Sequence, residues 1–572
     1  MKFYTECLSR ARGLFLGGTK LIWIITQEGV YTNLSGLVLD KEIIMQRVSG
    51  ILVHPTSFPG LYGIGDLGDG AYKFIDFMHK AKQSLWQILP LGPTGYGDSP
   101  YQSFSTFAGN HYLISPDLLL KEGYLTPSDL DSIPVFDSIN VDYGPVIDYK
   151  MNLYRVAFKR FKTDATPTQI KAYTKFCEDQ KSWLDNYTLF VSIKRHFIEE
   201  RKNEINSPAL DVFRQANQKY LTEGQIKDYY YGACWSSWPD DIAKYTEEAI
   251  TEYQILLAKE IEFHNFLQYE FFRQWTILRN YAHKKNIKIV GDVPIFVALD
   301  SSDVWAEPEL FQLDKTGNPR AVAGVPPDYF SETGQLWGNP LYDWTAHKKE
   351  GYTWWVRRIS GLLGMVDIIR IDHFIGFDSY WATPYGNTTA VNGKWIKGPG
   401  KSIFTAMLKE LGKLPIIAED LGEITESVIA LRDSMRFPGM KVLQFAFSPD
   451  GKNPYLPHNF ESSNTVVYTG THDNDTTIGW YNNSASEEEK DYYRRYLNVS
   501  GDNVAWDLIR LAWASNAAYA IAPIQDVFSL GTEARMNTPG EPSGNWRFRY
   551  TSDMLKSELA EKLAYLTETF NR

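Results

Sequence analysis

Residues 365–374 read Met-Val-Asp-Ile-Ile-Arg-Ile-Asp-His-Phe, and this stretch decides the fold class. Its run of β-branched residues is typical of a strand that is buried on both faces. Arg370 and Asp372 are two positions apart, so on a strand their side chains point to the same side. A neighbouring cation favours the ionised form of Asp372. An ionised carboxylate at the carboxyl end of a buried strand is a candidate nucleophile, although a structural ion pair would give the same pattern.

Short apolar runs of this kind recur along the chain. They end near residues 53, 91, 293, 372, 419, 447, 469 and 524, and helical periodicity separates most of them. Eight strand–helix units predict an α/β fold, a (β/α)₈ barrel, with its closing helix at 555–570. We therefore predict one catalytic barrel over residues 47–572.

Two segments are too long to be simple connections between a strand and a helix. Residues 95–272 are rich in charged helical patterns, and residues 297–350 are rich in glycine and aromatic residues. We expect both to be inserted subdomains over the catalytic face, the first of them mostly helical. Residues 1–46 precede the first segment that reads as folded, and we expect them to be a non-catalytic extension.

Composition excludes several classes of function. The net charge of -11 gives no basic footprint for nucleic acid and suits a neutral substrate. The chain has 17 Trp and 35 Tyr, whose rings can stack on sugars, although many will be core. Its three cysteines lie far apart and fit a reducing compartment, with no disulfide framework or zinc site. We predict no metal, no membrane span and a cytoplasmic monomer or homodimer, with a plastid as the alternative location.

Three of the predicted strand ends carry carboxylates: Asp372, Glu419 and Asp473. Two opposed carboxylates can cleave a glycosidic bond with retention, one as nucleophile and one as acid. Apolar residues before Glu419 could raise its pKa for acid work, and Asp473 could bind sugar hydroxyls in the transition state. A lone acid at a strand end can also cap a helix. The acidic loop 472–475 resembles a calcium loop but lacks the twelve-residue spacing.

Five motifs together carry a resemblance to a known family. They are Ser-Gly-Ile-Leu-Val-His-Pro-Thr-Ser (49–57), Gly-Asp-Val-Pro-Ile (291–295), Arg-Ile-Asp-His-Phe (370–374), Ala-Glu-Asp-Leu-Gly (418–422) and Thr-His-Asp-Asn (471–474). From about Arg47 to the C-terminus the chain resembles the 4-α-glucanotransferases of the α-amylase superfamily, also called amylomaltases or disproportionating enzymes.

The resemblance implies an activity and a set of site residues. A segment of an α-1,4-glucan would pass to the 4-hydroxyl of an acceptor glucose or glucan, with maltooligosaccharides, starch or glycogen as substrates and no cofactor. Asp372 would be the nucleophile, Glu419 the acid/base and Asp473 the transition-state stabiliser. The substrate-binding residues would be Arg370, His472, Tyr101, Ser99, Asp292, Asp328, Gln335, Trp337, Asp420, Asn537 and Pro539.

Two other functions compete with this one. A plain α-1,4-glucan hydrolase shares the three carboxylates, whereas a sugar-binding barrel without chemistry would not need them. Transfer requires that a sugar hydroxyl be positioned and water excluded. We expect the segment 300–340 to cover the barrel mouth, with Gly324, Gly334 and Gly338 allowing it to move.

Overall fold

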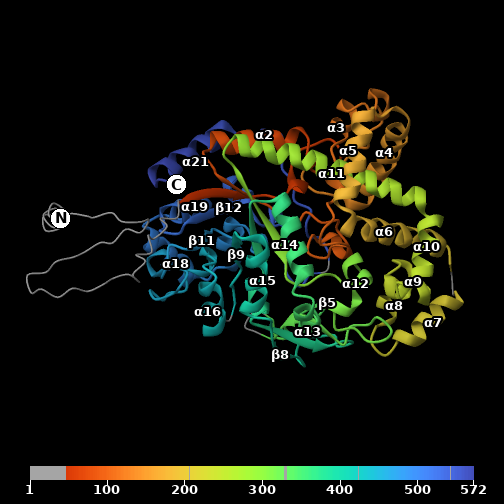
Figure 1. Cartoon of the computed structure of the whole chain (residues 1–572). Coiled ribbons are helices and arrows are strands. Elements are labelled where there is room, and N and C mark those ends of the chain that lie inside the picture. Colours follow the sequence, from red (N-terminus) through yellow and green to blue (C-terminus); the bar gives the residue numbers. More distant parts are fainter. Residues whose placement is uncertain (1–46, 205–206, 328–330, 423, 542) are drawn as a thin grey trace, which may run out of the picture. The chain divides into compact units, whose positions relative to one another are not determined.

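The computed structural model describes residues 47–572 apart from 205–206, 328–330, 423 and 542 (Figure 1). The predicted extension 1–46 and the predicted site residue Asp328 therefore lie outside the described residues. Eight parallel strands form a sheet in the order β10-β11-β12-β1-β2-β3-β6-β9. The strands are β1 (Val48–Leu52), β2 (Leu85–Gln87), β3 (Lys288–Pro294), β6 (Ile368–Asp372), β9 (Ile416–Ala418), β10 (Gly439–Val442), β11 (Thr465–Tyr468) and β12 (Tyr519–Pro523). The predicted barrel architecture is confirmed.

Two strands end earlier than predicted. β2 stops at Gln87 rather than near residue 91, and β10 stops at Val442 rather than near residue 447. After Gln87 the ladder continues only through Ile88 N, which donates to Val290 O at 2.9 Å, and then Pro90 has no N–H to offer. After Val442 the chain turns into a short 3₁₀ helix. Most residues of both apolar runs stay buried beyond the strand ends, although Phe445 is exposed, so the apolar pattern extends further than the strand hydrogen bonds.

The barrel is nearly closed, with a seam between β9 and β10, which are the two ends of the ladder. In the described part of the chain, one backbone hydrogen bond crosses this seam, from Ala418 N to Pro438 O at 2.9 Å.

Elsewhere the strands approach closely. A Cβ on Gly50 of β1 would lie 2.1 Å from Leu85 O of β2, so only glycine fits at that position.

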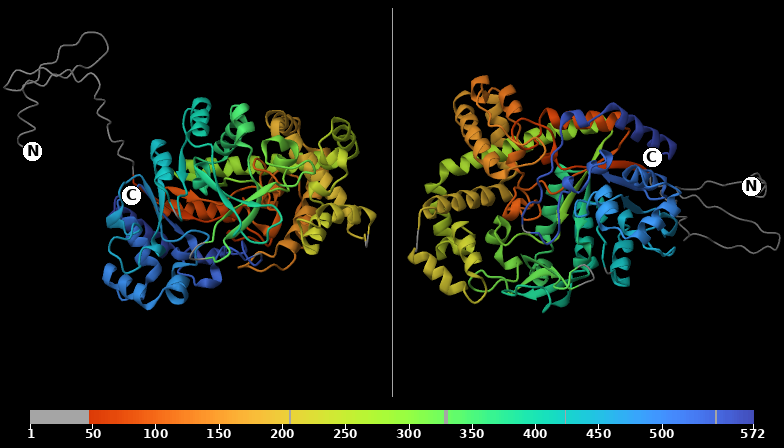
Figure 2. Two further views of the ribbon diagram at one scale, coloured as in Figure 1. Left: turned by 90° about the horizontal axis from the view of Figure 1, so that it is seen from below. Right: turned by 180° about the vertical axis from the view of Figure 1, so that it is seen from behind.

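Helices surround the barrel strands (Figures 1 and 2). The helix α2 packs against α21 and α11, and α14 packs against α15. The outer helices are α2 (Asp69–Lys80), α11 (Ala258–Lys284), α14 (Thr353–Met365), α15 (Lys401–Leu411), α16 (Glu426–Ser434), α18 (Glu487–Leu497), α19 (Val504–Ala514) and α21 (Ser557–Thr569). Their apolar faces and the strands share one large buried core.

Helices fill the long connection between β2 and β3 and gather on one side of the barrel (Figure 1). They are α3 (Pro116–Lys121), α4 (Tyr143–Asp164), α5 (Pro167–Asp179), α6 (Lys181–Arg201), α7 (Pro208–Asn217), α8 (Glu223–Tyr231), α9 (Asp240–Ala243) and α10 (Glu247–Leu256). The long helix α11 contacts α4, α5 and α6 as well as α2, α14 and β3. The predicted boundary at residue 272 falls inside α11, which joins the helical group to the barrel.

A second, antiparallel sheet has the order β5-β4-β7-β8. Its strands are β4 (Ala321–Val325), β5 (Gln335–Pro340), β7 (Ser379–Pro384) and β8 (Lys394–Lys397). Two strands come from the predicted insertion 297–350, and two follow β6, which the sequence analysis did not foresee. A Cβ on Gly324 would lie 2.3 Å from Gln335 O, so this glycine permits close pairing of β4 with β5. Its expected role in loop movement is therefore replaced by a packing role.

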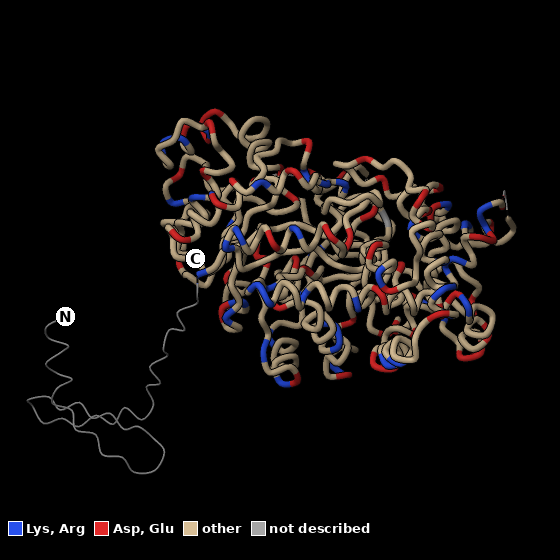
Figure 3. Tube along the Cα trace, turned by 90° about the horizontal axis from the view of Figure 1, so that it is seen from above, with Lys and Arg blue, Asp and Glu red and all other residues tan. Residues whose placement is uncertain are grey.

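Basic and acidic residues are interspersed along the described trace (Figure 3). Among the described residues, no helix combines the length and the apolar character needed to cross a membrane.

Candidate active site

The barrel brings the three predicted carboxylates to the same end of the sheet. Asp372 is the last residue of β6, Glu419 directly follows β9, and Asp473 lies in the loop after β11. β6 pairs with β9 through Ile371 and Ala418, so Asp372 and Glu419 follow adjacent residues of neighbouring strands. Parallel strands place their carboxyl ends on one face of a barrel, where barrel enzymes carry their active sites.

Arg370 is shared between two carboxylates. Its Nη1 lies 2.8 and 2.7 Å from the two oxygens of Asp292 on β3, and 3.1 Å from Asp372 Oδ1. The register of β3 and β6 sets Asp292 directly opposite Arg370. Both Arg370 and Asp292 are buried. Asp292 is therefore the main partner that fixes the guanidinium beside the candidate nucleophile.

Burial dominates the electrostatics of Asp372. It raises the pKa of Asp372 to about 6, while Arg370 acts in the opposite direction and favours the ionised form. The negative charges of Asp292 and Asp473 raise this pKa further. The neighbouring arginine thus only partly offsets the effect of burial, which the sequence pattern alone did not reveal.

Glu419 is held by two backbone donors. His373 N donates to its Oε2 at 2.7 Å, and Leu421 N donates to its Oε1 at 2.8 Å. His373 has a left-handed backbone with φ of 55° and follows Asp372 directly, so the turn after Asp372 also supports Glu419. Burial raises the pKa of Glu419 to about 7, and the charge of Asp372 adds to this effect. Arg370 and the two N–H groups act against it.

The loop that carries Asp473 is fixed by the segment 535–537. Asn537 Nδ2 donates to Asp473 Oδ1 at 2.6 Å, and Arg535 Nη2 donates to the backbone oxygen of Asp473 at 2.7 Å. His472 Nε2 lies 3.3 Å from Asp473 Oδ2. Asp473 keeps a side chain that is 41% exposed, so it can still reach a ligand.

Tyr101 and His472 form an aromatic wall next to these carboxylates. Their rings stack at 5.2 Å with an angle of 15° between the planes, and Trp546 packs against both. The Tyr101 hydroxyl donates to Asp292 Oδ2 at 2.9 Å, and Ser99 Oγ accepts a bond from Tyr101 N at 3.2 Å. The predicted residues Tyr101, Ser99, Asp292 and His472 therefore lie together.

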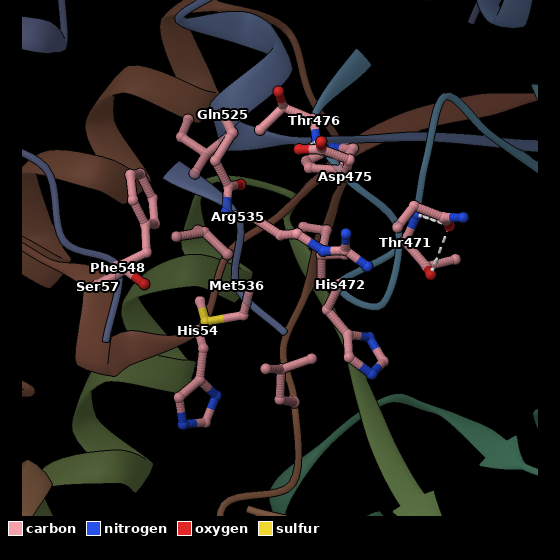
Figure 4. Close-up of a pocket in the computed structure, with 16 residues that line it drawn as sticks. His54, Ser57, Thr471, His472, Asp475, Thr476, Gln525, Arg535, Met536 and Phe548 are labelled. Atoms are coloured by element: carbon pink, nitrogen blue, oxygen red, sulfur yellow. Dashed lines mark hydrogen bonds between the residues drawn. The ribbon is translucent and has the colours of Figure 1, made fainter. Parts of the chain in front are cut away.

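A pocket borders this wall through His472 and Arg535 (Figure 4). His54, Met536 and Phe548 are among its other lining residues, and the three carboxylates are not. The figure shows His54, Met536 and Phe548 grouped on one side of the pocket, with the acidic and hydroxyl side chains of Asp475 and Thr476 on another. This pocket lies beside the candidate catalytic centre rather than at it.

The remaining predicted residues lie in three places. Trp337 and Gln335 lie on β5, and the Trp337 ring meets His373 edge to face at 4.8 Å, with its Nε1 donating to Gln335 Oε1 at 3.1 Å. β5 therefore reaches the residue next to Asp372. Pro539 is exposed on the loop after Asn537. Asp420 is buried, and both of its oxygens are engaged by other protein groups, Met440 N and Arg432.

Comparison with known proteins agrees with this geometry. A family model described as 4-alpha-glucanotransferase, glycoside hydrolase family 77, matches residues 53–555. The chain belongs to this family. A 4-alpha-glucanotransferase of Synechocystis sp. is 48% identical over 538 residues, covering 94% of this chain and 99% of the relative. The Solanum tuberosum relative, named chloroplastic/amyloplastic, is 42% identical and covers 92% of this chain and 87% of its own length. The resemblance predicted from the five motifs is confirmed.

Solved structures of two amylomaltases share the fold of this chain. The amylomaltase from Streptococcus agalactiae, solved in complex with acarbose, superposes with a TM-score of 0.83 at 37% identity, covering 92% of this chain and all of that one. The amylomaltase from Corynebacterium glutamicum has a TM-score of 0.70 at 16% identity, over 91% of this chain and 75% of that one, and shows the fold alone.

Sequence reasoning missed four contributors to the candidate site. Two are backbone groups, the N–H groups of His373 and Leu421. The other two are Arg535, which supports Asp473, and Trp546, which packs on the aromatic wall. Arg535 lies two residues before the predicted Asn537, so its charge next to that motif was an available signal. A backbone donor leaves no signal in side-chain identity.

We expect the transfer activity of this glucanotransferase to have a bell-shaped pH dependence. Asp372 must be ionised to act as nucleophile, so activity should fall as the pH drops below about 6. Glu419 must be protonated to act as acid, so activity should fall as the pH rises above about 7. Initial rates on maltotriose at constant ionic strength would measure both limbs. A rate that is constant from about pH 5 to about pH 9 would contradict these assignments.

Proposed function

We propose that the chain transfers a segment of an α-1,4-glucan to the 4-hydroxyl of an acceptor glucose or glucan by a retaining double displacement. The observation that carries this proposal is the adjacency of the two carboxyl groups. Asp372 contacts Arg370, and His373, the residue after Asp372, donates its N–H to Glu419. Retaining glycoside chemistry needs one ionised carboxylate and one protonated carboxyl group close together. Asp372 and Glu419, on neighbouring strand ends, can supply these two groups.

The first displacement uses these two groups in opposite protonation states. The carboxylate of Asp372 attacks the anomeric carbon while protonated Glu419 gives its proton to the leaving glycosidic oxygen. The bond to the leaving sugar breaks, and a glycosyl ester forms on Asp372. In the second displacement, ionised Glu419 takes the proton of the acceptor 4-hydroxyl, whose oxygen attacks the same carbon and releases Asp372. Asp473 would bind sugar hydroxyls as the ring distorts.

Transfer instead of hydrolysis requires that water be kept from the glycosyl ester. Two features support this. β5 brings Trp337 against His373, directly beside the nucleophile. On another side, the Tyr101–His472 stack provides an aromatic wall on which a sugar ring can pack. The acarbose complex of the Streptococcus agalactiae amylomaltase supports oligosaccharide ligands of that kind for this chain.

The test is incubation with maltotriose, with chain lengths and total reducing ends followed together. Because each transfer exchanges one glycosidic bond for another and frees no anomeric carbon, we expect longer maltooligosaccharides and free glucose at a constant number of reducing ends. An α-1,4-glucan hydrolase would instead increase the reducing ends without making longer chains. That result would overturn the proposed exclusion of water by β5.

The predicted location and assembly remain predictions. The sequence indicates a cytoplasmic monomer or homodimer, with a plastid as the alternative compartment. The free thiols of Cys177 and Cys234 in the structure are compatible with a reducing compartment. Bacterial relatives and a plant relative named for plastids match this chain, and they support both compartments.

A further inference from the structure

The seam of the barrel lies directly beside the proposed acid/base. β9 ends at Ala418, and Glu419 follows directly. β9 and β10 lie at the two ends of the strand order and do not pair with each other as strands. The side chain of Asp420 crosses this seam. Its Oδ1 accepts a hydrogen bond from Met440 N of β10 at 2.7 Å, and its Oδ2 pairs with Arg432 of α16. A carboxylate thus takes the place of the missing strand pairing.

The packing around this carboxylate is close. The Asp420 side chain is 6% exposed. A Cβ on Gly439, the first residue of β10, would lie 2.4 Å from Asp420 Oδ2 and 2.7 Å from Arg432 Nη1. The ion pair therefore occupies space that only a glycine at position 439 leaves free. On the inner side of β10, Met440 Sδ lies 3.4 Å from Arg370 Nε, so the seam also touches the partner of the nucleophile.

An anchored Asp420 would fix the carboxyl group of Glu419. Leu421, which follows Asp420, donates its N–H to Glu419 Oε1, and His373 N donates to Oε2. If Asp420 lost its hold on β10, Glu419 would keep its backbone hydrogen bonds to the β6 side, and Ala418 N would keep its bond to Pro438 O. Asp420 and Leu421 would lose their side-chain anchor across the seam. The Leu421 donor would then no longer stay in place. Because both N–H groups lower the pKa of Glu419, their loss would raise that pKa.

We propose that Asp420, held by Arg432 and Met440, is a positioning residue that closes the open side of the barrel and orients Glu419. This role replaces the sugar-binding role that the family resemblance implies. Both carboxylate oxygens already have protein partners, so a sugar hydroxyl would have to displace Met440 N or Arg432. The proposal rests on the proposed function of Glu419 as acid/base.

The test compares Asp420→Asn and Arg432→Met with the unmodified enzyme on maltotriose. We expect kcat to fall about 10- to 100-fold in both variants, with KM changed by less than about twofold, because the acid is misplaced rather than the substrate unbound. The alkaline limb of the pH profile should move to higher pH. A sugar-binding Asp420 predicts instead a raised KM for Asp420→Asn, an unmoved limb, and an Arg432→Met variant that behaves like the unmodified enzyme. That set of results would overturn the proposal.

Two further variants guard against a general loss of folding. Gly439→Ala pushes on the ion pair while leaving Asp420 and Arg432 in the sequence, and it should lower kcat and move the same limb. Arg432→Lys keeps the positive charge and should lose less activity than Arg432→Met. If Gly439→Ala keeps both the unmodified kcat and the unmodified limb, the proposal fails even if Arg432→Met does not fold.

A matched control removes the negative charge of a second carboxylate, Asp433, which pairs with the same guanidinium on its exposed side. Asp433 lies 2.8 Å from Arg432 Nη2 and is 59% exposed. We expect Asp433→Asn to leave kcat, KM and the pH limb unchanged, and a shift as large as that of Asp420→Asn would count against a role specific to the seam. Failure of the proposed function is distinguishable, because Glu419→Gln would then retain full activity on maltotriose whatever the seam variants do.

Discussion

Asp372→Asn is expected to lower kcat for maltotriose transfer by about four orders of magnitude or more, because an amide cannot form the glycosyl ester. The change should leave the fold intact. Arg370 keeps both hydrogen bonds to Asp292, so no buried guanidinium loses its main partner. Burial raises the pKa of Asp372, so the ionised carboxylate opposes folding above that pKa. The amide removes this cost, and we expect the melting temperature at neutral pH not to fall.

The measurement is the initial rate of transfer together with thermal unfolding of the same sample. Asp367→Asn is the matched control, since Asp367 lies just before the other end of the same strand and binds Arg279 and Ile289 N. Asp367→Asn should lower the melting temperature and leave kcat of the folded enzyme unchanged. Asp372→Asn should do the reverse, lowering kcat without lowering the melting temperature. Residual turnover of Asp372→Asn above about one per cent of the unmodified rate would exclude Asp372 as the nucleophile.

Glu419→Gln is expected to reduce cleavage of maltotriose by about 10²- to 10⁴-fold, because the leaving sugar oxygen then departs without a proton. A glycosyl fluoride carries a leaving group that needs little protonation. The first displacement on this donor, measured as the initial release of fluoride, should therefore be affected far less. The amide has one acceptor oxygen for the two N–H groups of His373 and Leu421, so we also expect a stability loss of about 1–3 kcal/mol.

Glu426→Gln is a suitable control for Glu419→Gln. Glu426 is exposed in the first turn of α16, and the same change of chemistry there should alter neither donor's rate. Comparing the two donors separates the acid role from a general disturbance. An equal loss on maltotriose and on the fluoride would show that Glu419 does not act as the acid.

The three carboxylates could be found from the sequence because each follows an apolar run that forms a strand. The pattern around Asp372 and Glu419 contains both the strand and the acid. The pairing of Arg370 with Asp292 could not be found, because it depends on the register of β3 against β6, which no single strand encodes. The burial of Asp372 arises from the whole barrel and raises its pKa. The adjacent arginine, considered alone in the sequence, suggested that the ionised form is more stable than it is in the structure.

The segments that cover the barrel were harder to predict than the barrel. The second sheet takes β7 and β8 from residues after Asp372, and both strands are short. The role of Asp420 depends on Arg432 from a helix, Met440 from a strand and the missing Cβ of Gly439. Such an arrangement combines the loop after β9 with α16 and β10, whereas the resemblance in the motif around Glu419 implies a sugar-binding role for Asp420.

The position of β1 has a consequence for how the chain assembles. β1 hydrogen-bonds to β2 on one side and to β12 on the other, so its partners come from opposite parts of the chain. During synthesis β1 is made long before β12, and one of its edges stays open until the last strand appears. The helices α3–α10 precede β3 in the chain, so they are synthesised before six of the eight barrel strands. The accessory helices would thus be built before the barrel closes, and the catalytic centre would be among the last parts of the molecule to exist.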